Sequence, residues 1–150
     1  MRTIEAYDGL SYFVFVNPKN VRAFRNSVSL GPETHGFLAI AGPYPDGLGV
    51  VRWGIAPESS TVFNLNNVEK RVLVLSARSI PGQTLTILLN ESEPLRHTFK
   101  TADFEDITVP LALIKGENRL TLRYAMHLPV TADKIKRAVL FREISLLPSQ

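Results

Sequence analysis

Five side chains in the middle of this sequence could together recognise a ligand rich in hydroxyl groups. They are two aromatic rings, two amides and one guanidinium, at Tyr44, Trp53, Asn66, Asn67 and Arg78. The apolar C–H faces of sugar rings stack on tryptophan or tyrosine, and amide and guanidinium groups hydrogen-bond the hydroxyls. A tryptophan is also commonly buried, so Trp53 has two interpretations of about equal weight, a ligand contact or a plug in the core.

Acidic residues offer a second kind of chemistry. Glu91 and Glu93 flank a predicted turn, and Asp103, Glu105 and Asp106 form a second acidic group. Two carboxyl groups held about 5–9 Å apart in a cleft could act on a glycosidic bond. Acids in turns more often serve solubility and turn hydrogen bonds, and nothing in the local sequence indicates the burial that raises a pKa. We therefore expect no catalytic site among them.

Two further acids are candidates for a metal site. Glu5 lies near the start of the chain and Glu143 lies in the last predicted strand, and the first and last strands of a sandwich are often neighbours. Calcium takes about six to eight oxygen ligands, which two carboxylates and backbone carbonyls could begin to supply. The favoured alternative is a surface ion pair or solvated acids. Calcium is the one cofactor that the sequence suggests.

The residues that most other enzyme chemistry needs are absent or scattered. The sequence has no cysteine, which excludes disulfides, thiolate metal sites and cysteine nucleophiles. The three histidines, His35, His97 and His127, are far apart and show no metal-ligand spacing. Neither a Gly-x-Ser-x-Gly elbow nor a glycine-rich phosphate loop occurs. We expect a protein that is not an enzyme.

Charge and hydropathy narrow the partners. The net charge is +3, and apart from residues 134–137 the basic residues are scattered, whereas nucleic-acid-binding surfaces usually carry a dense basic stripe. We therefore expect no nucleic-acid partner. No apolar run approaches the roughly 20 residues of a membrane-spanning helix, and the run at 12–16 is too short for a signal peptide. The compartment stays open: extracellular or cell surface if a leader or parent chain is missing, and cytoplasmic otherwise.

The apolar pattern predicts a single all-β domain over residues 1–150. A chain of this length with 45% hydrophobic residues can bury one substantial core. Short segments with strand-like composition, separated by turn signals, occupy 61–65, 71–78, 84–90, 95–100, 106–109, 118–125 and 138–147. Strands at intervals of about 8–12 residues are typical of an antiparallel sandwich or barrel. No strong helical pattern alternates with them, which disfavours a parallel sheet with crossover helices.

The first third of the chain is less regular. Residues 12–16 predict a buried strand, and Asn17-Pro18 resembles the start of a helix. We predict one short helix near residues 18–26, with an irregular loop as the alternative. Glycine and proline punctuate residues 31–54, which indicates a loop-rich region with short strands.

The region around residue 118 allows a specific local prediction. Gly116 can take a positive φ, and the Asn118 side chain can hydrogen-bond nearby backbone in the turn. The strand that follows alternates, so that Leu120, Leu122 and Tyr124 fall on one face.

The last predicted strand contains an irregularity. Phe141, Ile144 and Leu146 cannot share one face under strict two-residue alternation. A bulge at Arg142-Glu143 would bring them into phase. Without the bulge, Leu140 would face inward together with Ile144 and Leu146.

Several segments resemble the galactose-binding-like jelly rolls. The likeness covers roughly residues 50 to 147, and four places carry it. They are 52–54 followed by 60–63, 85–90 followed by 93–95, 107–110 followed by 116–120, and 139–144. Glu91 stands in place of a glycine after the second strand, and the third place is the "tVPl…GeNrL" stretch. The resemblance implies a jelly-roll sandwich and a carbohydrate-binding or accessory role in bacterial cell-surface or glycan-processing proteins. Residues 4–6 also resemble the opening strand of calcium-containing relatives, with Tyr7 where a second acid is often found.

Three functions follow as expectations. The first is a non-catalytic carbohydrate-binding or accessory module whose glycan meets the loops near Tyr44, Trp53 and Asn66-Asn67. The alternative is a structural or assembly subunit of a surface layer, virion or filament, or a protein-docking domain, because apolar residues occupy both faces of 71–78 and 84–90. Its partner would be another protein or a second copy of this chain. A third idea, a small glycan hydrolase or lyase, requires a cleft with two facing carboxylates.

Overall fold

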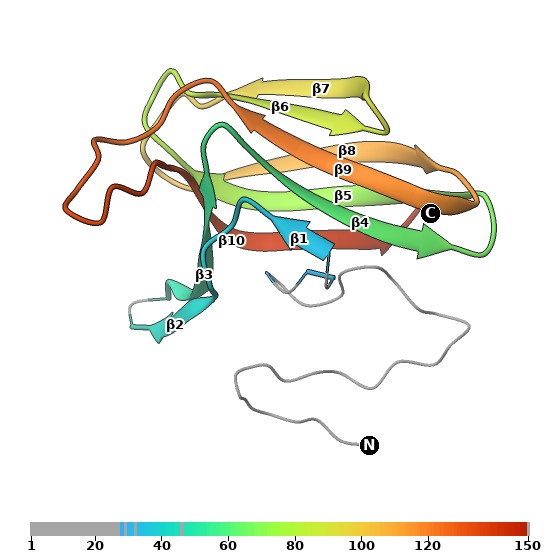
Figure 1. Ribbon diagram of the computed structural model, residues 1–150, viewed down its shortest axis with the longest axis horizontal. Coiled ribbons are helices and arrows are strands. Elements are labelled where there is room, and N and C mark those ends of the chain that lie inside the picture. The colour runs from blue at the N-terminus through green and yellow to red at the C-terminus, as the bar shows by residue number, and fades with distance from the viewer. Residues whose placement is uncertain (1–27, 29, 32, 46, 150) are drawn as a thin grey trace.

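Ten strands form two five-stranded antiparallel sheets in the computed structural model, which describes residues 28, 30–31, 33–45 and 47–149 (Figure 1). The first sheet contains, in spatial order, β1 (Glu33–His35), β4 (Glu58–Leu65), β9 (Gly116–Tyr124), β6 (Thr84–Leu89) and β7 (Ser92–Thr98). The second contains β2 (Ala41–Tyr44), β3 (Gly49–Ile55), β10 (Arg137–Pro148), β5 (Glu69–Arg78) and β8 (Glu105–Leu113). The prediction of an all-β antiparallel sandwich is confirmed.

One core lies between the two sheets because the strands alternate apolar and polar residues. In β8 and β9 every second side chain is buried, and these side chains meet across the sandwich. Leu73 and Leu75 of β5 face Leu85 and Ile87 of β6 in the same cluster, and all four are 0% exposed. Complete burial of such side chains supplies about 1.5–3 kcal/mol each, which is the main stabilisation of this fold.

The seven strands predicted between residues 61 and 147 correspond to β4 to β10. The loop-rich region before them holds the two short strands β1 and β2 and the longer β3. The predicted strand at 12–16, the predicted helix near 18–26 and the candidate metal ligand Glu5 lie outside the described residues. Within the described part of the chain there is no helix that is long and apolar enough to cross a membrane.

The bulge predicted in the last strand is confirmed. The pairing of β10 with β5 shifts register between Phe141 and Glu143. Phe141, Ile144 and Leu146 therefore all face the core, with exposures of 0%, 1% and 0%. The alternative, in which Leu140 faces inward, is wrong, because Leu140 is not part of the core cluster.

The turn before β9 also forms as predicted. Gly116 has φ 91°, in the left-handed region that favours glycine. The fully buried Asn118 accepts the Ile114 N–H at 3.0 Å and donates to the carbonyl oxygens of Ile114 and Gly116 at 2.8 and 3.2 Å. Its amide thus closes the β8–β9 connection.

The β6–β7 hairpin is tighter than predicted. The predicted strands at 84–90 and 95–100 leave residues 91–94 for the turn, but Leu89 already pairs with Ser92, and Pro94 lies within β7. Asn90 and Glu91 form the two-residue loop with φ 50° and 73°. Such hairpins need positive φ at both central residues, for which Asn-Gly is the preferred pair.

Candidate functional site

The outer face of the second sheet brings together two of the predicted ligand contacts. Trp53 of β3 and Arg78 of β5 both pair with Leu140 of β10, so the three side chains lie in one row across neighbouring strands. The row points away from the core, because Gly54, the residue after Trp53, faces Tyr124 of the opposite sheet. Trp53 is half-buried and Leu140 is 4% exposed. Trp53 is therefore not a plug in the core.

Phe104 extends this row at its far end. It precedes Glu105, which pairs with Ala77, so it lies beside Arg78. The Arg78 guanidinium carbon lies 5.0 Å from the centre of the Phe104 ring, and the Arg142 guanidinium carbon lies 4.1 Å from it. We call Trp53, Leu140, Arg78 and Phe104 the outer row. Its members span three strand spacings, or roughly 14 Å.

Arg142 reaches the outer row because of the bulge in β10. Its Nε and Nη2 donate to the Ser76 hydroxyl at 3.3 and 3.2 Å. Phe104 and Ser76 thus fix the guanidinium of Arg142 without a carboxylate. In the described part of the chain, neither Arg142 nor Arg78 takes part in an ion pair. Their remaining N–H groups are available to a ligand.

Phe37 and Leu38, which precede β2, contact β3, the strand that carries Trp53. The Leu38 N–H donates to the Trp53 carbonyl at 2.9 Å, and Arg52 Nε donates to the Leu38 carbonyl at 2.6 Å. The Arg52 guanidinium also lies over the Phe37 ring, 5.1 Å from its centre. Burial lowers the pKa of Arg52 from its usual value, and arginine stays charged at neutral pH. These contacts fix β3 at the edge of the core.

Glu105 closes the loop that carries Phe104. Its carboxylate contacts His97 of β7 at 2.8 Å and accepts the backbone N–H groups of Lys100 and Thr101 at 2.9 and 3.0 Å. Burial alone would raise the pKa of Glu105, but the hydrogen bonds from Thr101, His97 and Lys100 outweigh it and lower the pKa to about 2. This group is thus ionised at neutral pH, which makes it unsuited to act as a general acid.

Two acids flank the outer row. Asp106 and Glu143 both pair with Ser76, so they lie one row further along the same face. Glu143 accepts a hydrogen bond from the Ser145 hydroxyl at 3.0 Å. Among the described residues no three metal-ligating side chains are grouped. Calcium at Glu143 stays a prediction, since its proposed partner Glu5 lies outside them.

The other predicted ligand contacts lie elsewhere. Tyr44 is 46% exposed and pairs with Gly49, four residues along β3 from Trp53, or roughly 13 Å away. Asn66 and Asn67 lie in the β4–β5 turn, at the end of β5 opposite to Arg78. The structure therefore brings Trp53 and Arg78 together, places Tyr44 at the margin of their face and separates the two asparagines from them.

Sequence reasoning missed Phe104, Leu140 and Arg142 as members of this surface. The predicted bulge was a usable signal for Arg142, because a bulge re-aims the side chain that it displaces. The pairing of β5 with β8 that brings Phe104 to Arg78 has no such local signal.

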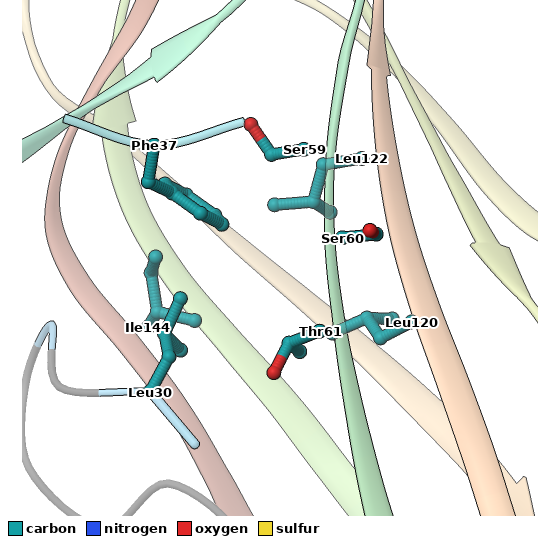
Figure 2. A pocket seen from close by; sticks show the side chains of 8 residues that line it. All are labelled: Leu30, Phe37, Ser59, Ser60, Thr61, Leu120, Leu122 and Ile144. Atoms are coloured by element: carbon teal, nitrogen blue, oxygen red, sulfur yellow. The ribbon is translucent and has the colours of Figure 1, made fainter. Parts of the chain in front are cut away.

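One cavity between the sheets, lined by described residues, is too small for a ligand of sugar size. It has a volume of about 10 Å³, enough for roughly one water molecule. Figure 2 shows Leu30, Phe37 and Ile144 facing residues of β4 and β9 across it.

Comparison with known proteins finds similarity in structure only. No protein-family model and no curated protein matches the chain. A GH26-CBM35 β-(1,4)-mannanase from Podospora anserina is similar with a TM-score of 0.52 and 16% identity over 78% of this chain, which spans 26% of the mannanase. A CBM35 from Paenibacillus barcinonensis aligns at 15% identity over 77% of this chain and 98% of its own, with a TM-score of 0.46. The module CBM6cm-2 of Cellvibrio mixtus lichenase 5A aligns at 11% identity over 79% and 92%, with a TM-score of 0.49. The mannanase match supports the predicted jelly-roll fold.

Proposed function

We propose that this chain is a non-catalytic carbohydrate-binding module and that the outer row, with Arg142, forms its ligand surface. The observation that carries the proposal is the alignment of Trp53 and Arg78 in one row that ends at Phe104. The half-buried Trp53 offers an aromatic ring for stacking on a sugar ring, and the exposed Arg78 and Arg142, which pack on Phe104, offer guanidinium groups for hydroxyl recognition.

The surface offers both hydrogen-bond donors and acceptors. Arg78 and Arg142 supply N–H donors, and Asp106 and Glu143 supply carboxylate oxygens on the adjoining row. A sugar hydroxyl both donates and accepts, so this mixture suits it. The length of the outer row, roughly 14 Å, favours several linked sugar rings over a single one.

The structural comparison suggests a first probe. The mannanase that shares the fold carries a carbohydrate-binding module in its name, and its substrate is a β-1,4-linked mannan. β-1,4-Mannan oligosaccharides therefore lead the panel, followed by other neutral and acidic oligosaccharides.

The test is calorimetric titration of the full chain with this panel. Trp53→Ala and Arg78→Ala should each weaken binding by about tenfold or more, because each removes about 1.4 kcal/mol or more of contact. Arg119→Ala is the matched control, since Arg119 is an exposed arginine of β9 in the other sheet. Equal loss in Arg119→Ala, or full affinity in Trp53→Ala, would refute the assigned surface.

Self-association is a second candidate function. Leu147, Val72 and Pro110 form an aliphatic row on the same outer face, and Leu147 and Val72 are only half-buried. Val72 is six residues along β5 from Arg78, roughly 20 Å away, so the two areas are separate. Light scattering across a concentration series tests this. A dimer in the wild type that Val72→Lys abolishes supports it, and a monomer at every concentration excludes it.

A further inference from the structure

Phe104 owes its place to a loop that crosses from one sheet to the other. The loop begins after Phe99, which is 1% exposed and whose backbone is tied to residues 82 and 83 by two hydrogen bonds of 2.8 Å. It ends at Glu105, which pairs with Ala77 in the second sheet. Residues 100–104 lie between these fixed points, and most of them are exposed.

One carboxylate accepts hydrogen bonds from two residues at the start of this loop. Glu105 Oε2 accepts three hydrogen bonds, from the N–H groups of Lys100 and Thr101 at 2.9 and 3.0 Å and from the Thr101 hydroxyl at 3.3 Å. The Thr101 hydroxyl in turn accepts the Asp103 N–H at 3.2 Å. A carboxylate satisfied by several donors holds its geometry strongly, because each bond is charge-assisted.

The other oxygen of Glu105 joins the two sheets. Oε1 lies 2.8 Å from His97 Nε2, and the His97 ring packs edge-on against Phe99 at 4.9 Å between centres. His97 belongs to the first sheet and Glu105 to the second. The two side chains are only 25% and 18% exposed. This contact fixes the carboxylate relative to the core.

Glu105 and Phe104 are consecutive residues, so their side chains point to opposite sides of the chain. Glu105 points toward His97 and the loop backbone, and Phe104 points toward Arg78 and Arg142. Any rotation of the loop about residue 105 would move the Phe104 ring away from both guanidinium groups.

We propose that Glu105 is a positioning residue for the ligand surface. Together with His97 it holds the 100–104 loop in the one arrangement in which Phe104 supports Arg78 and Arg142. The effect of Glu105 on ligand affinity rests on the proposed function, whereas its effect on the placement of Arg78 and Arg142 does not. Glu105 touches no ligand itself and acts through Phe104.

The test compares Glu105→Gln with Glu93→Gln in the full chain. Glutamine keeps the size of Glu105 but places an NH₂ donor where the carboxylate accepts hydrogen bonds. Glu93 is the matched control, because it is an acid of β7 that pairs with Arg96 on the surface. Nuclear magnetic resonance would follow the side-chain protons of Arg78 and Arg142, which the Phe104 ring shifts upfield, together with amide exchange at Lys100 and Thr101.

In Glu105→Gln we expect the upfield shifts of the Arg78 and Arg142 side chains to shrink. The amides of Lys100 and Thr101 should exchange at least about tenfold faster, while the core amides stay protected from exchange. Glu93→Gln should change neither. His97→Gln, which removes the ring contacts to Oε1 and to Phe99 but leaves the three hydrogen bonds to Oε2, should give a smaller change of the same kind and serves if Glu105→Gln does not fold. Unchanged arginine shifts in a folded Glu105→Gln or His97→Gln variant would overturn the proposal.

A double-mutant cycle on affinity separates the positioning role from a general loss of stability. Binding is measured by calorimetry with the tightest oligosaccharide of the panel. Glu105→Gln should weaken it about fivefold or more in the wild type and leave it unchanged in a Phe104→Ala background. Additive losses would overturn the proposal. If the wild type binds no glycan, the proposed function fails, and the resonance measurements still decide the role of Glu105.

Discussion

Gly54 and Tyr124 approach so closely across the sandwich that the Tyr124 hydroxyl occupies the space of a side chain at residue 54. A Cβ built on Gly54 would lie 2.7 Å from Tyr124 Cζ and 3.1 Å from Phe141 Cε2, well inside normal contact distance. The Tyr124 hydroxyl itself is hydrogen-bonded to the Ser59 hydroxyl at 2.6 Å. Burial raises the pKa of Tyr124 above its usual value. The close approach sets the depth of β3 in the sandwich and leaves Trp53 facing outward.

Gly54→Ala should destabilise the protein by about 3 kcal/mol, because the added methyl group overpacks the interface of the two sheets. Denaturant unfolding measures this. In a Tyr124→Phe background, which lacks the hydroxyl, the same substitution should cost about 1 kcal/mol less. Equal costs in the two backgrounds would show that the phenol oxygen is not the obstacle.

Glu91→Gly should stabilise the protein by about 0.5–1 kcal/mol. Glu91 has φ 73° in the β6–β7 hairpin, a conformation that glycine adopts without steric cost. The gain is the difference between the relieved strain and the greater freedom of glycine in the unfolded chain. A higher urea midpoint with an unchanged slope is the expected result. Ser92→Gly, at the first strand position after the turn, is the control and should lower the midpoint.

Asn118→Leu should cost about 2–4 kcal/mol. Asn118 is 0% exposed and bonds the backbone of Ile114 and Gly116, as well as the Asn90 side chain at 3.2 Å. Leucine has a similar volume but leaves these buried groups without their partner. Thermal unfolding should show the loss. Thr121→Leu, a half-buried position on the outer side of the same strand, should cost under about 1 kcal/mol.

Stability should fall in acid through Glu105. Its pKa is lowered from 4.5 to about 2 in the folded protein. A carboxyl group with a depressed folded pKa stabilises the protein above its unfolded pKa and loses this effect as the pH falls through the folded one. The contribution is therefore present above about pH 5 and disappears toward pH 2. Unfolding measured across this range should show a weaker pH dependence in Glu105→Gln than in Glu93→Gln, and identical curves would contradict the assignment.

The sequence predicted what depends on neighbours along the chain. The bulge in β10 follows from the phase of Phe141 and Ile144, and the turn at Gly116 and Asn118 follows from their conformational preferences. These features need no knowledge of which strands are paired.

The candidate surface was predictable only in part, because it depends on strand order. Trp53 and Arg78 meet through β10, which comes some sixty residues later in the chain than Arg78. The same strand order places Asn66 and Asn67 at the far end of β5. The residue types identified side chains suited to sugar contacts, but only the pairing of the strands shows which of these side chains lie on one surface.

Residue-resolved mapping of the bound ligand tests the central claim most directly. The full chain is titrated with the tightest oligosaccharide of the panel while the indole N–H of Trp53 and the side-chain N–H groups of Arg78, Arg142 and Arg119 are followed by nuclear magnetic resonance. The resonances of Trp53, Arg78 and Arg142 should shift with one common dissociation constant, and that of Arg119 should stay in place. Shifts confined to the β4–β5 turn or to the outer face of the first sheet, with the outer row unperturbed, would contradict the account.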